Sequence, residues 1–259
     1  MNVLEFKRVG FGYPGQTLIL SGVNLSLASG ERAIVLGSNG SGKSTIAFLA
    51  GGLLTPQKGE IFRNSRHQQR LRLGIVFQNS RLQMIGTTVE EDLAFGLSVL
   101  NYSPRQIRAK VDDFLQRFGL EEKRYFGSSQ LSGGELRRLA LAAVLIAEPE
   151  VLILDEPLGM LDSYHQAVFL YYLQHQISDQ VAVLWLDHDL RNIRHCNRYY
   201  LLKETQLNLV GLTELNNSLL LKEVGLEPAP LQPLEWQFPT RISNSIYGPE
   251  QIQFDKCES

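Results

Sequence analysis

The sequence has little cysteine, no long apolar segment and almost no excess of either charge. Cys196 and Cys257 are the only cysteines among 259 residues, which is too few for a disulfide framework and typical of a reducing, cytosolic setting. The longest apolar runs, 139–147 and 181–186, fall short of the about 20 residues that a membrane-spanning helix needs. Residues 1–8 mix charged and apolar side chains, so we expect no secretory signal there. These absences predict a soluble protein that reaches a membrane only through partner subunits.

The net charge also excludes some functions. With 25 basic and 27 acidic residues, the formal charge of −2 gives no general attraction to nucleic acid or anionic lipid. One local basic run is a candidate for such contacts, but we expect it to be a solvated loop or edge: Arg63, Arg66, His67, Arg70 and Arg72. The group His188, His195 and Cys196 matches no zinc-site spacing. We therefore expect neither a nucleic-acid partner nor a zinc site.

Hydrophobic patterning predicts strands first and helices later. Alternation at 4–9 and 23–27 and an apolar run at 32–36 indicate strands, as do 61–62 and 72–77, and a helix is expected from about Gly42 to Ala50. Residues 89–147 are mainly helical in pattern, with Gly119 as a stop and Ser132 as a helix cap. The apolar runs 151–154 and 181–186 are typical of central strands in a parallel sheet. After Gln206 the pattern weakens, apart from a short helix expected within 215–226, and prolines crowd the stretch after Pro228.

A phosphate-binding loop is the strongest motif. Residues 37–44 read GSNGSGKS, which matches G-x-x-x-x-G-K-[ST] between a predicted strand and a predicted helix. Glycines let several backbone N–H groups point at phosphate oxygens, and the helix adds its positive end. Lys43 supplies a charge to the β- and γ-phosphates, and the Ser44 hydroxyl suits Mg²⁺. The predicted ATP-binding residues of this segment are Gly37, Ser38, Asn39, Gly40, Ser41, Gly42, Lys43, Ser44 and Thr45.

Two acids follow the apolar run 151–154. Asp155 and Glu156 are therefore expected at the carboxyl end of a parallel strand, the edge at which ligands bind. There Asp155 can hold Mg²⁺, and Glu156 can orient the water that attacks the γ-phosphate or accept its proton. Alone, the pair is equally compatible with two solvated acids in a turn. Together with the phosphate loop it completes one Mg-nucleotide site.

A second glycine-rich segment precedes a predicted helix, and its residues are Leu131, Ser132, Gly133, Gly134 and Glu135. It forms a second phosphate-binding surface, which one nucleotide on one chain does not need. The segment resembles the signature motif of ABC ATPases, and the other motifs stand in that family's order over about residues 3–203. The resemblance implies two ATPase subunits, in a homodimer or a heterodimer, arranged head to tail, with the signature of one closing over ATP held by the other. Glu135 departs from the usual Gln of this motif.

The resemblance assigns roles to four further residues. Tyr13 matches the aromatic that stacks on adenine, although without the family it is better explained as packing in a core or turn. Gln78 matches the glutamine that senses Mg²⁺ and the attacking water, and so joins Ser44 and Asp155 as a metal ligand. His188 matches the switch histidine at the γ-phosphate. Asp162 matches the loop that communicates across the dimer, but Leu158 replaces the Thr or Ser with which that loop usually begins, which puts the coupling between the two sites in doubt.

The segment 76–97 is more specific. Gln83 and the run VEEDLAFG at 89–96 resemble the ATPases of energy-coupling factor importers, including the cobalt/nickel and biotin types. This implies a peripheral, cytoplasmic position on a membrane scaffold subunit, with a separate membrane subunit that captures a metal ion or vitamin. The alternatives are that these residues only pack the helical subdomain, that the chain is a soluble assembly or scaffold ATPase, or that it is a regulatory nucleotide binder.

The fold expected from the patterns and the resemblance is α/β. It has a phosphate-loop NTPase core with a mainly parallel sheet, an antiparallel β layer near the N-terminus and a helical subdomain at about 89–147. We expect residues 1–205 to form the ATPase domain and residues 206–259 an extension of unassigned role. Because Lys43, Asp155, Glu156 and His188 are all present, the site is predicted to hydrolyse ATP.

Overall fold

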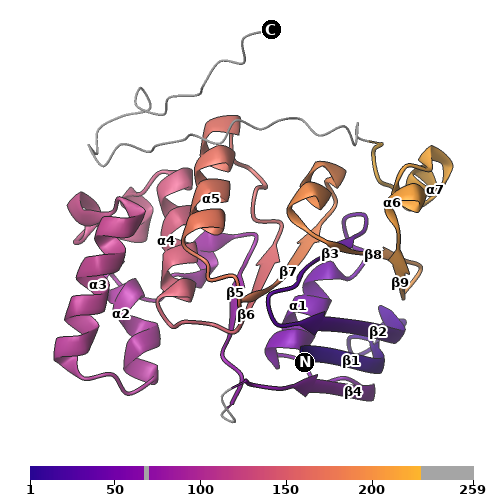
Figure 1. The fold of residues 1–259 in the computed structure, drawn as a ribbon, viewed down its shortest axis with the longest axis horizontal. Helices are drawn as coiled ribbons and strands as arrows, with labels where there is room; N and C mark the ends of the chain where they lie inside the picture. The colour runs from indigo at the N-terminus through magenta and orange to yellow at the C-terminus, as the bar shows by residue number, and fades with distance from the viewer. Residues whose placement is uncertain (67–69, 229–259) are drawn as a thin grey trace, which may run out of the picture. The chain divides into compact units, whose positions relative to one another are not determined.

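The computed structural model describes residues 1–66 and 70–228, which form two compact units (Figure 1). The sheet unit contains residues 1–78, 149–157 and the described residues from Asp179 onward. The helical unit contains Asn79–Glu148 and Leu158–Ser178. His67, Cys257 and the proline-rich stretch after Pro228 lie outside the described residues. Within the described part of the chain, no helix is long and apolar enough to cross a bilayer.

The main sheet of the sheet unit is largely parallel, as predicted. Its strand order is β5-β6-β7-β3-β8-β9, in which only β9 runs antiparallel to its neighbour. The strands are β3 (Arg32–Leu36), β5 (Leu73–Val76), β6 (Val151–Asp155), β7 (Ala182–Asp187), β8 (Arg198–Lys203) and β9 (Gln206–Val210). Every residue of β6 and β7 is buried, as expected for strands covered on both faces. The carboxyl ends of β3, β6 and β7 therefore meet at one edge.

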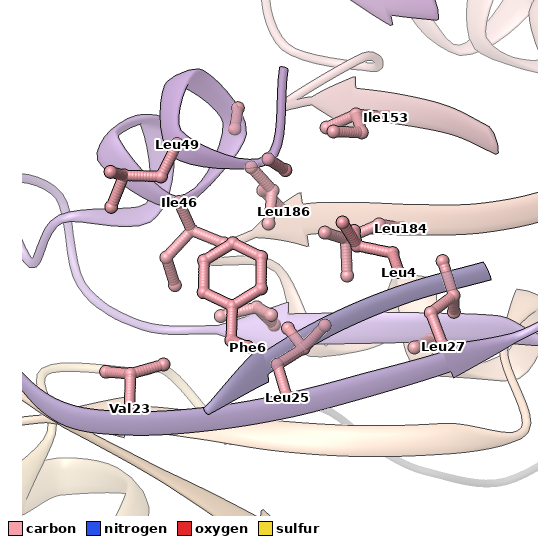
Figure 2. Close-up of a cluster of buried hydrophobic side chains, with 14 of the residues drawn as sticks. Leu4, Phe6, Val23, Leu25, Leu27, Ile46, Leu49, Ile153, Leu184 and Leu186 are labelled. Atoms are coloured by element: carbon pink, nitrogen blue, oxygen red, sulfur yellow. The ribbon is translucent and has the colours of Figure 1, made fainter. Parts of the chain in front are cut away.

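A smaller antiparallel sheet lies near the N-terminus, which confirms the predicted β layer. Its strand order is β2-β1-β4, with the bounds β1 (Asn2–Phe11), β2 (Leu20–Ala28) and β4 (Lys58–Arg63). Phe6 and Leu25 of this sheet share one buried cluster with Ile46 of α1 (Lys43–Gly51) and with Leu184 and Leu186 of β7 (Figure 2). Both sheets and α1 thus close around one core, which fixes the helix that follows the phosphate loop.

The basic run serves this scaffold. The guanidinium of Arg63 donates to the carbonyls of Leu49 and Ala50, in the last turn of α1. Cationic side chains are favourable at this end of a helix because the last carbonyls have no partner within it. Arg66 donates its backbone N–H to Glu150 and also forms an ion pair with it, at 3.6 Å between Nε and Oε2. Two residues of the basic run therefore hold other segments of the sheet unit in place. The sequence analysis expected only a solvated loop or edge here.

The helical unit contains the helices predicted within residues 89–147 and one more. They are α2 (Val89–Val99), α3 (Pro104–Phe118), α4 (Gly133–Leu145) and α5 (Ser163–His175). As predicted, α3 ends at Gly119, which has a φ of 61°, and α4 begins at the capping residue Ser132. The ring of Phe118 stacks on Phe114 at 5.7 Å and on Tyr172 of α5 at 4.8 Å between centroids. Aromatic stacking therefore ties α3 to α5.

Some local elements differ from the sequence-based expectation. Strands β8 and β9 were not predicted, and β9 joins the main sheet although the proposed division of the chain lies at 205/206. The short helix expected within 215–226 is α7 (Ser218–Glu223), and a further short helix that was not predicted, α6 (Leu212–Leu215), precedes it. Asn217 separates them, because its side chain accepts from the N–H groups of Leu219 and Leu220 and so begins a new helix. The short 3₁₀ turns are η1 (Ser80–Gln83), η2 (Glu121–Lys123), η3 (Ser128–Gln130) and η4 (Leu190–His195).

Gly59 offers a test of the β1–β4 pairing. Its φ is 72°, and a Cβ there would lie 2.3 Å from the carbonyl oxygens of both Lys7 and Arg8. Gly59→Ala should therefore lower the free energy of unfolding by about 3 kcal/mol, measured by urea denaturation. Gly15→Ala is the matched control, since its φ is 76° but nothing lies within 4 Å of the added Cβ, and it should cost only about 1 kcal/mol. Equal losses in the two variants would contradict this account of the pairing.

Candidate functional site

The phosphate loop joins the end of β3 to the start of α1. Gly40 and Gly42 adopt φ values of 78° and 107°, which a side chain would disfavour. The Gly37 N–H donates to the carbonyl of Asp187 at 3.2 Å, so the loop is anchored to the end of β7. The backbone N–H groups at the start of α1 have no partner within the helix and present a partial positive charge. This edge of the sheet is therefore suited to bind phosphate.

Lys43 is buried beneath the loop, with 5% of its surface exposed. Its Nζ donates to the carbonyl oxygens of Gly37 at 2.9 Å and Ser38 at 3.0 Å. It also lies 3.3 Å from Oε1 of Glu156. The ammonium group is thus held at the centre of the loop, where its charge is available to a bound phosphate.

Glu156 is the point at which the predicted site residues meet. Its backbone has a φ of 44°, uncommon for a residue with a side chain, and its N–H donates to the carbonyl of Leu186 at 2.9 Å. The carboxylate accepts a hydrogen bond from Nε2 of Gln78 at 2.9 Å and lies 3.3 Å from Nδ1 of His188. With Lys43, these contacts bring together four residues from four separate segments.

Asp155 ends β6 and is almost fully buried. Burial raises the pKa of this carboxyl, while a hydrogen bond with the Ser44 hydroxyl and the charge of Lys43 act in the opposite direction. Ser44 and Asp155 together present the hard oxygen donors that Mg²⁺ prefers. Among the described residues, no cluster of three or more His, Cys, Asp or Glu side chains could hold a metal alone. The donor set fits a magnesium ion that takes its other ligands from phosphates and water.

A cavity of about 330 Å³ opens over these residues, and its lining contains much of the predicted set: Tyr13, Ile19, Asn39, Gly40, Gly42, Lys43, Ser44, Thr45, Gln78 and Glu156. Tyr13 packs edge-on against Phe11, with 5.1 Å between ring centroids. Sequence analysis did not identify Ile19, whose Cγ2 would lie 2.7 Å from a Cβ added to Gly42. No local motif marks Ile19, because its place in the site depends on the fold around the loop.

The remaining predicted residues belong to the helical unit. Ser132 and Glu135 form a capping box at the start of α4, in which Glu135 Oε2 accepts from Ser132 N at 2.8 Å. Asp162 caps α5 and holds Nδ1 of His165 at 2.9 Å. A Cβ on Gly134 would meet the His165 ring at 1.8 Å, so this position has no room for a side chain. The signature-like segment and the loop around Asp162 are therefore connected through His165.

The histidine and cysteine that follow His188 have structural surroundings. The ring of His195 stacks on Trp185 at 5.6 Å, and burial lowers the pKa of His195 to about 4. Burial also raises the pKa of the Cys196 thiol to about 12. The ring is stacked and the thiol is buried, which gives both residues a packing role.

Residues 20–159 match the ABC transporter family. The chain is 35% identical over 239 residues to the energy-coupling factor transporter ATP-binding protein EcfA of Methanosarcina acetivorans, with 88% of this chain and 87% of that protein covered. It is 30% identical over 252 residues to the corresponding protein EcfA1 of Clostridium novyi, covering 91% of this chain and 90% of that one.

A solved structure agrees with these relatives. CbiO1 of Clostridium perfringens, described as part of the ABC transporter complex cbiONQ, aligns with a TM-score of 0.70 at 31% identity, over 86% of this chain and 92% of that chain. Sequence, fold and the composition of the cavity thus agree. The chain belongs to the ABC transporter family, in which it is an ATP-binding ATPase subunit of the energy-coupling factor transporter type.

Proposed function

We propose that two copies of this architecture bind ATP and Mg²⁺ between them and that hydrolysis drives a membrane partner to import a small solute, such as a metal ion or a vitamin. The observation that carries the proposal is the arrangement at Glu156. Its carboxylate lies within 3.3 Å of the Lys43 ammonium, the Gln78 amide and the His188 ring, with Glu156, Lys43 and Gln78 on the wall of one cavity. These are the groups that phosphoryl transfer to water requires.

Each of these side chains lies where it can carry out one step of ATP hydrolysis. Lys43 and the N–H groups of the phosphate loop hold the β- and γ-phosphates. Glu156 orients a water molecule and accepts its proton as the oxygen attacks the γ-phosphorus and ADP leaves. Gln78 holds the Glu156 carboxylate, and His188 donates to the γ-phosphate from the end of β7. Mg²⁺, held by Ser44, Gln78 and Asp155, would neutralise charge that develops on the phosphate oxygens.

The segment from Leu131 to Glu135, the second phosphate-binding surface, supports the proposal of a dimer. Ser132 and Gly133 are exposed at the start of α4, a helix of 13 residues whose first backbone N–H groups have no carbonyl partner within the helix. Met160, close to Asp162 in the sequence, is 97% exposed with a φ of 62°. We propose that the residues from Leu131 to Glu135 contact the phosphates bound by a second ATPase subunit and that Asp162 lies at the contact between subunits.

The membrane partner is proposed from an apolar surface of the helical unit. Leu82, Ile85, Phe95 and Val99 are exposed by 81%, 66%, 47% and 66%. All four lie within residues 82–99, and exposed apolar side chains are typical of a protein contact. We propose that they meet a membrane scaffold subunit, which keeps this chain at the cytoplasmic face and accompanies a separate solute-capturing subunit. The relatives named as energy-coupling factor transporter proteins support this assignment.

Glu156→Gln tests the hydrolytic role. The amide keeps the shape of the side chain but cannot accept the proton, so steady-state ATP hydrolysis should fall by about a hundredfold or more while ATP binding stays intact and an ATP-bound dimer accumulates. Phosphate release, equilibrium ATP binding and size-exclusion chromatography measure the three effects. Glu60→Gln, at an exposed position of β4, is the control and should leave all three unchanged. Unaltered turnover in Glu156→Gln would remove Glu156 from the chemistry.

Ser132→Arg tests the dimer contact. The long side chain should block closure over the nucleotide of the partner, so the ATP-induced dimer is lost while each isolated chain still binds ATP. Because arginine also removes the cap of α4, Ser132→Asp is the companion variant: it retains a capping side chain and sets a negative charge against the phosphates. Ser98→Arg, at an exposed position of α2, serves as control. A normal ATP-induced dimer in both Ser132 variants would show that this segment has no part in closure.

A further inference from the structure

The side chain of Asp187, which directly precedes His188, has no part in the proposed function. It ends β7 and is 4% exposed. Oδ1 accepts from the backbone N–H groups of His188 at 2.7 Å and Asp189 at 3.0 Å. Oδ2 accepts from Nε1 of Trp185 and from Nδ2 of Asn192, both at 2.8 Å. One buried carboxylate therefore satisfies four donors.

These donors come from both sides of His188. Trp185 lies on β7, before the histidine, whereas Asn192 lies on η4, after it. The Asp187 carboxylate thus joins the end of the strand to the following turn and fixes the short segment between them. In addition, the backbone carbonyl of Asp187 accepts the Gly37 N–H of the phosphate loop at 3.2 Å. The same residue connects the loop with the segment that carries His188.

Packing alone does not hold the His188 ring. Its side chain is 46% exposed, and its Nδ1 lies 3.3 Å from Glu156 Oε1 and 3.6 Å from Asp187 Oδ1. For a ring so exposed, the position of the imidazole follows mainly from the position of its own backbone and from these two carboxylates. A backbone shift of about 1 Å is enough to misplace a catalytic group.

We propose that Asp187 is a positioning residue, which holds the backbone of His188 so that its imidazole meets Glu156 and the γ-phosphate. The inference rests on the role of His188 in the proposed function. A carboxylate suits the task because both of its oxygens accept, so it can serve two backbone and two side-chain donors together. An amide has one accepting oxygen and a hydroxyl one oxygen in total, and neither can serve all four.

Asp187→Asn tests the proposal with little change of shape. The amide oxygen can keep the two backbone N–H groups, but the amide nitrogen then faces two donors, Trp185 Nε1 and Asn192 Nδ2. The segment should shift, and kcat for ATP hydrolysis should fall by about tenfold or more, while the Kd for ATP stays within about twofold of the wild type. An unchanged kcat would overturn the proposal.

A second variant separates positioning from general stability. In the exchange Asp187→Asn with Asn192→Asp, the amide at 187 can donate to the new carboxylate at 192, which restores the link between β7 and η4. Trp185 Nε1 still faces the amide nitrogen in the exchange, so kcat should recover in part and lie clearly above that of Asp187→Asn alone. Failure of the exchange to recover kcat, when Asp187→Asn alone has lowered it, would mean that the carboxylate does not act by holding this segment.

Glu150→Gln is the matched control. Glu150 is 3% exposed and accepts from the Ser65 hydroxyl and the Arg66 N–H, but it precedes β6 and so lies at the opposite end of the sheet from the site. Glu150→Gln should lower the midpoint temperature of thermal unfolding by about as much as Asp187→Asn does, without lowering kcat. A fall in kcat in this control matching that of Asp187→Asn would assign the effect to stability, and the proposal would fail.

His188→Ala distinguishes this inference from the proposed function. If His188→Ala keeps full turnover, the role of His188 is wrong and the inference fails with it. If His188→Ala removes turnover but Asp187→Asn leaves kcat unchanged, only the inference on Asp187 fails. Loss of kcat in both variants, with recovery in the exchange, supports both.

Discussion

The candidate site depends on the carboxylate of Glu156, a residue whose backbone conformation is unfavourable for a residue with a side chain. A φ of 44° turns the chain sharply after β6, and the hydrogen bond from its N–H to Leu186 binds that turn to β7. Such strain persists only where the surrounding structure enforces it. Here buried parallel strands enforce it, because they bring the ends of β3, β6 and β7 to one edge. Lys43, Gln78 and His188 then lie within 3.3 Å of the same carboxylate.

Much of the fold and of the phosphate-binding site could be predicted, because short sequence patterns determine where these strands, helices and loops form. The bounds of β3 and the start of α1 follow from an apolar run and from glycines at the phosphate loop, and both lie where the sequence predicted. The order of the motifs indicated the ABC transporter family before any distance was known, and the comparisons confirm it. Strand β8 was missed because its sequence, RYYLLK, does not alternate between polar and apolar residues, and β9 was missed although QLNLV does alternate, because it is only five residues long.

The contacts of Ile19 and Asp187 had no comparable signal. Ile19 reaches the phosphate loop from a different part of the chain, and only the fold places its side chain against Gly42. Asp187 is a charged residue at the end of an apolar strand, and the sequence does not say that four donors surround it. Local patterns determine which elements form, whereas tertiary packing determines which polar groups meet.

The capping box explains why Glu135, in place of the usual Gln, is compatible with the start of α4. Glu and Gln can both accept from the N–H of Ser132.

The central claim is that two copies share each nucleotide, with the phosphate loop of one facing the signature segment of the other. An experimental structure of the Glu156→Gln protein, saturated with ATP and Mg²⁺, tests it most directly. The account predicts that Ser132 and Gly133 of one copy lie within hydrogen-bonding distance of the γ-phosphate held by Lys43 of the other. A saturated complex in which the segment from Leu131 to Glu135 is remote from every nucleotide would contradict it and leave only a phosphate-loop ATPase that works alone.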